Sequence, residues 1–164
     1  MLVQALGVEP SRITAWAADL EGAAVAQAVG IRLQLQPLTP DNYNSLLAAH
    51  LRPGDVLLNL AVEVSSFDLI AWCQQHDVLY LDTSIEPWPG GYMPHQGLEH
   101  NTNHWLRHQV MTLQQPHRAT AVVAHGANPG LISHLTKRAL EQLAHDQGLT
   151  FAPGQWASVA KALG

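Results

Sequence analysis

A carboxylate and an indole lie close together in a loop that two prolines restrain. Residues 79–93, LYLDTSIEPWPGGYM, open as an apolar strand and then pass into the segment Glu86–Pro89, in which Trp88 lies between two prolines. Proline sets φ near about −65° and restricts the residue before it, so both side chains are held in few orientations. Taken alone, this pattern favours a surface loop whose tryptophan packs onto the core. The alternative is a prearranged pocket for a cation.

Other polar side chains follow the ends of expected strands. Asp19, Asn59, Asp82 and Glu86 all lie at or just past such ends. Sheets of parallel strands bind ligands at the carboxyl ends of their strands. Position alone therefore makes these four residues candidates for a binding site.

The elements that would position these residues alternate along the chain. Apolar runs and helix signals predict strands at residues 13–18, 31–36, 56–61, 78–82 and 120–125, and helices at 22–29, 43–51, 65–75, 102–115 and 131–145. Such alternation is typical of right-handed βαβ units in an α/β fold with a mostly parallel sheet.

The turn after the last expected strand has two interpretations. In the segment His125–Gly130, Asn128 suits the N-cap and Pro129 the first position of the following helix. The turn would also aim helix N–H groups into the cleft. His125 could then move the proton of an amine, since imidazole acts as both acid and base near neutral pH; a structural histidine is the alternative.

Metal and thiol chemistry find little support. His100, His104 and His108 recur every four residues, with His95 nearby, but they form no H-E-x-x-H motif and leave further zinc ligands unassigned. We expect a solvated helix face and no metal. The single cysteine, Cys73, lies in an apolar helical pattern and is expected to be buried rather than catalytic.

Composition narrows the class of protein. The 164 residues are 47% hydrophobic, which suits one ordinary core, and the net charge is −5 with only 8 lysines and arginines. No basic patch for nucleic acid is visible, and no apolar run approaches the length of a membrane span. The N-terminus lacks the pattern of a signal peptide, so we expect a cytoplasmic location. A negative surface is compatible with cationic substrates.

One feature of dinucleotide-binding folds is missing. The glycine fingerprint G-x-G-x-x-G, which precedes the first helix of such folds, is absent, and no G-x-G occurs in the chain. Residues 2–6, followed by Gly7, resemble the end of that first helix. In the strand order 3-2-1-4-5-6 the missing first strand would lie between residues 13–18 and 56–61. We expect these two strands to pair directly, and Asp19 to be the acid that holds ribose hydroxyls, or else only a carboxylate at a helix N-terminus.

Several segments resemble the bacterial homospermidine synthase family, a member of the saccharopine dehydrogenase-like group. The specific ones are DTSIEPWPGG and HGANPGLISH, and LTPDNYNSLL, PGDVLLNLAVEVSS, TNHWLRHQV and WASVAKALG extend the similarity over nearly the whole chain. Enzymes of this family use NAD to oxidise a diamine to an imine, lose ammonia after a second amine attacks, and return the hydride to the new imine.

The resemblance implies a fold, ligands and residue roles. The fold would be an incomplete Rossmann-like, doubly wound sheet without its first strand, with residues 1–93 a partial dinucleotide-binding domain and 94–164 leading toward a truncated substrate domain. NAD would be the cofactor, putrescine and spermidine the substrates, and the complete protein a homodimer. The implied catalytic residues are Glu86, Trp88, His125 and Asn128, and the implied cofactor-binding residues are Asp19, Asn59, Asp82 and Thr83.

Three interpretations remain open at this point. The chain is part of a homospermidine synthase, a related reductase of another amine or amino acid, or a domain without catalysis, such as an assembly module. The family continues beyond the similar region into a part that completes the pocket, and its glycine fingerprint has no counterpart here.

Overall fold

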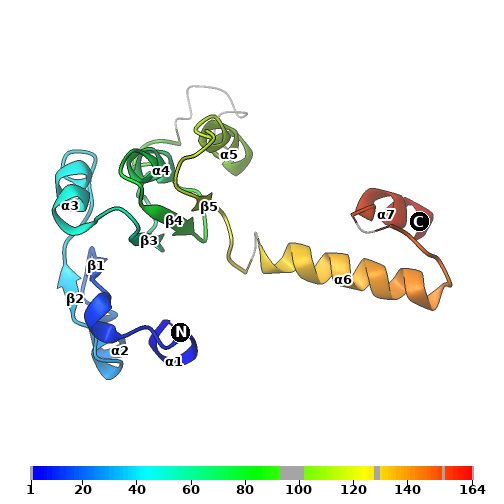
Figure 1. Cartoon of the computed structure of the whole chain (residues 1–164), viewed down its shortest axis with the longest axis horizontal. Coiled ribbons are helices and arrows are strands. Elements are labelled where there is room, and N and C mark those ends of the chain that lie inside the picture. The colour runs from blue at the N-terminus through cyan, green and yellow to red at the C-terminus, as the bar shows by residue number, and fades with distance from the viewer. Residues whose placement is uncertain (1, 93–101, 128–129, 153, 164) are drawn as a thin grey trace.

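The structure, a computed structural model, describes residues 2–92, 102–127, 130–152 and 154–163. Its strands form two parallel sheets, with the order β1-β2 in one and β3-β4-β5 in the other. Figure 1 shows α3, α4 and α5 on one side of the strands and α1 and α2 on the other. The expected α/β class, with parallel strands and a partial Rossmann-like arrangement, is confirmed.

The first sheet is a single βαβ unit. Strand β1 (Ala15–Ala17) pairs in parallel with β2 (Leu33–Leu35), and α2 (Ala23–Ala28) connects them. Gly30, with a φ of 77°, ends the turn after α2, a backbone conformation that favours glycine. Both strands are shorter than the apolar runs that predicted them.

The second sheet carries the buried strands. Strand β3 (Val56–Asn59) pairs with β4 (Leu79–Asp82), which pairs with β5 (Ala121–Val122), and all pairs are parallel. Asn59 and Asp82 are register partners, so β3 and β4 end side by side. Asn59 and Asp82, two of the polar residues predicted at strand ends, therefore reach the same edge of this sheet.

The expected direct pairing of the strands that became β1 and β3 is wrong. The two strands belong to separate sheets, and no ladder joins them. The Trp16 ring packs edge-on against His50, with centroids 4.8 Å apart, and Trp16 also contacts the core cluster of the second sheet. Side-chain packing, in which Trp16 contacts the core cluster, thus takes the place of a ladder between the two strands.

Helix α4 shows why the second sheet is well defined. It spans Ser66–Gln75, and Ser65 caps it by accepting a hydrogen bond from the Asp68 backbone N–H at 3.2 Å. Its apolar residues recur at helical spacing and are buried against the sheet. The core they join contains Leu47, Val64, Leu69, Ile70, Trp72, Cys73, Val78, Tyr80, Ile85 and Val110.

The remaining elements complete the chain. They are α1 (Leu2–Leu6), the 3-10 helix η1 (Pro10–Arg12), α3 (Tyr43–His50), α5 (Asn103–Met111), α6 (Leu131–Asp146) and α7 (Trp156–Leu163). The expected helical end of residues 2–6 is thus confirmed as α1, and the helices expected around 43–51, 102–115 and 131–145 are present. No helix in the described residues is both long and apolar enough to cross a membrane.

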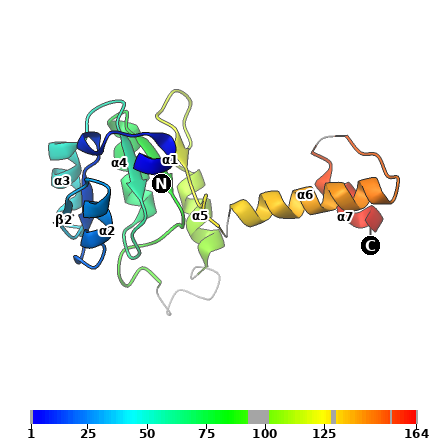
Figure 2. The same cartoon turned by 90° about the horizontal axis from the view of Figure 1, so that it is seen from below.

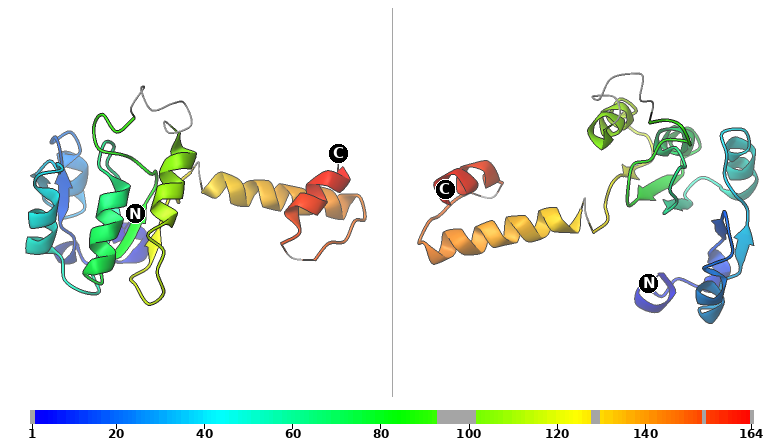
Figure 3. Two further views of the ribbon diagram at one scale, coloured as in Figure 1. Left: turned by 90° about the horizontal axis from the view of Figure 1, so that it is seen from above. Right: turned by 180° about the vertical axis from the view of Figure 1, so that it is seen from behind.

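The last two helices stand apart from the sheets. Figures 1, 2 and 3 all show α6 leading away from β5, with α7 packed beside it. The Lys137 ammonium lies 5.8 Å from the centre of the Trp156 ring, which links the two helices. Several apolar side chains of α6 are exposed, among them Leu131, Ile132, Leu135 and Leu143. The division into segments 1–93 and 94–164 stays a prediction.

Candidate functional site

A cavity lies between the loop after β4, the start of α4 and one face of α5. Its volume is about 390 Å³. The lining residues are Ser65, Phe67, Ile85, Glu86, Pro87, Trp88, Pro89, Gly90, Gly91, Trp105, Leu106, Gln109 and Val110. Among these described residues Glu86 is the single ionisable group, so the cavity combines aromatic walls with one carboxylate.

The backbone of Glu86 is fixed to the first residue of α4. The Ser66 backbone N–H donates to the Glu86 carbonyl at 2.8 Å, and the Glu86 N–H donates to the Ser66 hydroxyl at 3.1 Å. Ser66 is fully buried. The Ser84 hydroxyl donates to Oε1 of the Glu86 carboxylate at 3.2 Å. These contacts fix where the carboxylate lies at the cavity wall.

Trp88 is fixed by the same helix. Its indole N–H donates to Oδ2 of Asp68 at 2.6 Å, and its ring lies 5.6 Å from the ring of Tyr43 in a tilted arrangement. The Gly91 N–H donates to the Trp88 carbonyl at 2.9 Å and closes the loop. A Cβ at Gly91 would lie 2.5 Å from the Cβ of Pro87, so this turn leaves no room for a side chain.

Tyr92 follows the loop that contains Glu86 and Trp88, and it was not among the residues expected at the site. Burial, and then the negative charge of Glu86, raise the pKa of the Tyr92 hydroxyl. This hydroxyl donates to Oδ1 of Asn103 at 3.0 Å, which links the loop to the start of α5. Phe67, Trp105 and Gln109 were missed as well. The spacing of four residues between Trp105 and Gln109 in an expected helix was the signal that could have placed both on one face.

Asn59, Tyr80 and Asp82 form a buried chain of hydrogen bonds across β3 and β4. The Asn59 amide donates to the Tyr80 hydroxyl at 3.1 Å, and this hydroxyl donates to Oδ2 of Asp82 at 2.9 Å. The other oxygen of Asp82 accepts from the Ala124 N–H, and Oδ1 of Asn59 accepts from the Ala61 N–H. Both side chains thus hold the end of the sheet together.

The buried chain also changes the acidity of its members. Burial raises the pKa of the Asp82 carboxyl, and hydrogen bonds from Ala124, Tyr80 and Ser66 only partly oppose it. Burial, followed by the charge of Asp82, raises the pKa of the Tyr80 hydroxyl. The neutral forms of both groups are therefore favoured relative to water.

The turn after β5 meets the end of β4. The His125 N–H donates to the Asp82 carbonyl at 3.1 Å, and a Cβ on Gly126 would lie 3.1 Å from the Cβ of the exposed Thr83. The His125 ring lies 5.9 Å from that of His134 and is not part of the cavity lining. Helix α6 begins after Gly130 as its N-cap. Asn128 and Pro129, expected to cap this helix, lie outside the described residues.

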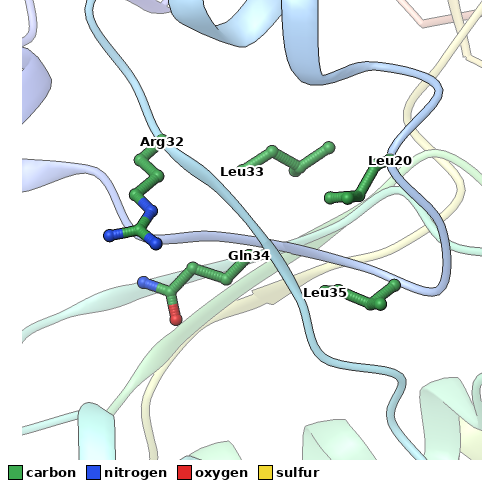
Figure 4. A pocket seen from close by; sticks show the side chains of 5 residues that line it. All are labelled: Leu20, Arg32, Leu33, Gln34 and Leu35. Carbon is green, nitrogen blue, oxygen red and sulfur yellow. The ribbon is translucent and has the colours of Figure 1, made fainter.

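Asp19 lies at the other sheet. It follows β1, is exposed, and its Oδ1 accepts from the Glu21 N–H at 2.9 Å. A second, open hollow of about 510 Å³ is lined by Leu20, Arg32, Leu33, Gln34 and Leu35. Figure 4 shows the leucines on one side of the strand and Arg32 and Gln34 on the other. Because this hollow has no carboxylate in its lining, the smaller cavity is the better candidate for a cation.

The expected histidine face is only partly described. His104 and His108 lie in α5, whereas His95 and His100 lie outside the described residues. Within the described ranges no group of three or more His, Cys, Asp or Glu side chains is placed to hold a metal ion. Cys73 is buried, and burial raises the pKa of its thiol to about 12.

Known proteins resemble this chain over most of its length. Homospermidine synthase of Blastochloris viridis is 38% identical over 154 residues, which are 88% of this chain and 32% of that protein. Homospermidine synthase of Mesorhizobium japonicum is 37% identical over 147 residues, 82% of this chain and 30% of that protein. The chain thus spans about a third of the length of these relatives.

A solved structure shares the fold. The crystal structure of homospermidine synthase from Legionella pneumophila in complex with NAD matches with a TM-score of 0.80 and 37% identity, covering 96% of this chain and 33% of that one. The model of the saccharopine dehydrogenase NADP binding domain matches residues 1–124. Because this match covers more than half of the chain, the chain belongs to the family of the saccharopine dehydrogenase NADP binding domain.

Proposed function

We propose that this chain forms the nucleotide-binding part and one wall of the diamine pocket of a homospermidine synthase. The reaction proposed for the whole enzyme transfers an aminobutyl group between diamines. Putrescine is oxidised to an imine, a second amine adds, ammonia leaves, and the new imine is reduced. A homodimer located in the cytoplasm belongs to the same proposal. The observation that carries it is the cavity in which Glu86 is the one carboxylate among aromatic walls.

The cavity suits one end of a diamine. An ammonium group at Glu86 gains a charge-assisted hydrogen bond, and the aliphatic chain gains apolar contact with the walls. Trp88 and Trp105 line the same space. An ammonium over an indole face gains about 0.5–2 kcal/mol, depending on how far it is desolvated. Hydrogen bonds to Ser66 and Asp68 hold Glu86 and Trp88 in place before the ligand binds. The entropy cost of ordering these side chains on binding is therefore small.

The residues present fit part of NAD. Asp19 is exposed after β1, where an acid accepts hydrogen bonds from ribose hydroxyls, and Thr83 is exposed at the end of β4. Asn59 and Asp82 are buried with their side chains engaged, so we propose that they position the strand ends rather than contact the nucleotide. No glycine-rich turn for the pyrophosphate occurs in the chain. When bound, NAD would supply the acceptor and later the donor of the hydride.

Titration of the chain tests the pocket directly. Isothermal titration with putrescine should show weak binding, and 1,4-butanediol, which has the same length without charge, should show none. The variant Glu86→Gln should lower putrescine affinity about tenfold or more, in line with the loss of a charged hydrogen bond. Equal affinity of the two ligands would count against the pocket.

A complete enzyme tests the reaction. We would replace the matching segment of the Blastochloris viridis enzyme by residues 2–163 of this chain and measure product by mass spectrometry. Trp88→Ala should reduce diamine turnover more than NAD binding, because the indole lines the cavity and Asp19 is not among the lining residues. An equal loss of both would contradict the assignment.

The same assay separates the related reductase from the synthase. A synthase leaves the redox state of NAD unchanged overall and releases one ammonia for each product. A reductase or dehydrogenase consumes or accumulates NADH in proportion to turnover. Net change in NADH without homospermidine would favour the reductase, and the absence of both would favour a domain without catalysis.

A further inference from the structure

A buried carboxylate meets the backbone of the turn that follows β5. Asp82, the last residue of β4, is fully buried, and Oδ1 of its side chain accepts from the Ala124 N–H. Its main-chain carbonyl accepts from the next N–H along the chain, that of His125, at 3.1 Å. Asp82 thus binds two successive N–H groups of the turn, one through its side chain and one through its backbone.

Ala124 adopts an uncommon backbone conformation at this contact. Its φ is 52°, in the left-handed region that favours glycine, and the strand β5 has already ended at Val122. A residue with a Cβ stays in this region only where the surrounding structure holds it there. Because the N–H groups of Ala124 and His125 both donate to Asp82, this residue is the part of the sheet that holds the turn.

The turn also lies close to the residue after Asp82. A Cβ on Gly126 would lie 3.1 Å from the Cβ of Thr83 and 3.2 Å from its carbonyl oxygen. The two chain segments therefore approach each other at the carboxyl edge of the sheet, where parallel sheets bind ligands. A change in the path of the turn would move His125 relative to this edge.

The sheet holds the Asp82 side chain from the other direction. Oδ2 accepts from the Tyr80 hydroxyl at 2.9 Å, and the Asn59 amide donates to the same hydroxyl at 3.1 Å. The two oxygens of one carboxylate thus have different partners, since Oδ2 binds within the sheet and Oδ1 binds the turn. This division makes Asp82 a link between the sheet and the turn.

We propose that Asp82 is a positioning residue, which holds Ala124 in its left-handed conformation and thereby fixes where the His125 imidazole lies. Asp82 is fully buried, so it acts through His125 rather than by touching a ligand. The use of this placement, which is to let His125 move the proton of an amine, rests on the proposed reaction. The hydrogen bonds that fix the turn do not depend on that reaction.

Amide hydrogen exchange of the chain without ligand tests how the turn is held. Asp82→Ala removes the acceptor of Ala124 and should speed exchange at the Ala124 and His125 amides about tenfold or more, the equivalent of one charged hydrogen bond. Each rate is divided by that of the Leu79 amide, which donates to Asp55 at the other end of β4 and reports general loss of stability. Asp82→Asn keeps an oxygen for the Ala124 N–H and should restore protection to within about threefold of the wild type. Unchanged exchange in Asp82→Ala, or an equal loss of protection in both variants, would overturn the inference.

A glycine at position 124 provides a second test with a matched control. Ala124→Gly accepts the left-handed conformation at little cost, so it should reduce the effect of Asp82→Ala on the His125 amide. Ala127 lies in the same turn and its φ is not positive, so Ala127→Gly should give no such reduction. Where Asp82→Ala alone does not fold, Ala124→Gly should restore folding and Ala127→Gly should not. The same outcome for both glycine variants would contradict the inference.

The Blastochloris viridis enzyme that carries residues 2–163 of this chain tests what the turn does in the reaction. Asp82→Ala and His125→Gln should each lower kcat for homospermidine formation, and Asp82→Asn should recover most of the loss. The double variant Asp82→Ala, His125→Gln should lose no more than the worse of the two single variants, because the histidine is already misplaced. Losses that multiply would contradict a role through His125. Failure of the unsubstituted hybrid to form homospermidine would count against the proposed function alone, because the exchange rates decide independently whether Asp82 holds the turn.

Discussion

Nε1 of Trp88 lies 2.6 Å from Oδ2 of Asp68, so the first turn of α4 holds the tryptophan of the candidate cavity. The two residues are 20 positions apart and belong to different elements. Asp68 thereby takes part in two contacts, because its backbone N–H also donates to the hydroxyl oxygen of the N-cap residue Ser65. Stability of the helix start and geometry of the pocket depend on the same residue.

Removal of this carboxylate should affect both properties. Asp68→Ala should lower the free energy of unfolding by about 1–2 kcal/mol, since a charged hydrogen bond is lost in a partly exposed place and an acidic group leaves a helix N-terminus. It should also weaken putrescine binding. Urea denaturation and isothermal titration measure these effects. The control is Asp146→Ala on the exposed end of α6, where a change above about 0.5 kcal/mol is not expected.

The Ser66 hydroxyl should matter far more than that of an exposed helical serine. Ser66→Ala leaves the Glu86 N–H without its acceptor and should cost about 1–3 kcal/mol of unfolding free energy. Ser133, exposed in the first turn of α6, is the matched control, and Ser133→Ala should change stability by about 0.5 kcal/mol or less. Similar losses in the two variants would show that the contact between Ser66 and Glu86 contributes little.

The turn at Gly91 should reject even a methyl group. In Gly91→Ala the new Cβ would meet Pro87 at 2.5 Å and the Trp88 carbonyl at 2.9 Å. We expect a loss of about 1–3 kcal/mol from overpacking, together with weaker putrescine binding because Trp88 must move. Gly22→Ala is the comparison, since its nearest atom is 3.8 Å away. Thermal unfolding of both variants measures the effect. An unchanged melting temperature of Gly91→Ala would mean that the loop can relax to accept the methyl group.

Local rules account for what the sequence predicted well. Helix α4 was expected from its serine cap and apolar spacing, and strands β3 and β4 from short apolar runs between turns; each depends on neighbours within a few residues. The separation of β1 and β3 was not predicted, because the expectation weighed the cost of unpaired backbone groups alone. In the structure the two sheets meet through side-chain packing that involves Trp16, and a contact between residues as far apart in sequence as Trp16 and His50 is not visible in local patterns.

The site shows the same limit. Position at strand ends was enough to place Asn59, Asp82 and Glu86 near one edge, but not to distinguish buried residues from exposed ones. The hydroxyl of Tyr80, two residues before Asp82, is the group that engages both Asn59 and Asp82 and turns them toward the interior. Trp105 lines the cavity from α5, whose position depends on long-range packing.

The buried Asp82 should give stability an unusual dependence on pH. Its folded pKa is raised above the ordinary value of 3.8, so the folded chain keeps the proton at pH values where the unfolded chain has released it. The free energy of unfolding therefore decreases as pH rises above about 4. The decrease is complete once pH exceeds the raised folded pKa. This sign is opposite to that of a salt-bridged carboxylate.

The variant Asp82→Asn isolates this contribution. An amide still accepts from the Ala124 N–H and can pair with the Tyr80 hydroxyl, but it does not titrate. The difference in unfolding free energy, variant minus wild type, should therefore increase in favour of the variant between pH 4 and pH 7, as measured by urea denaturation at each pH. Other carboxylates cancel in this difference. A difference that stays constant, or that shifts in favour of the wild type as pH rises, would show that Asp82 is ionised in the folded chain at the pH where it is ionised in water.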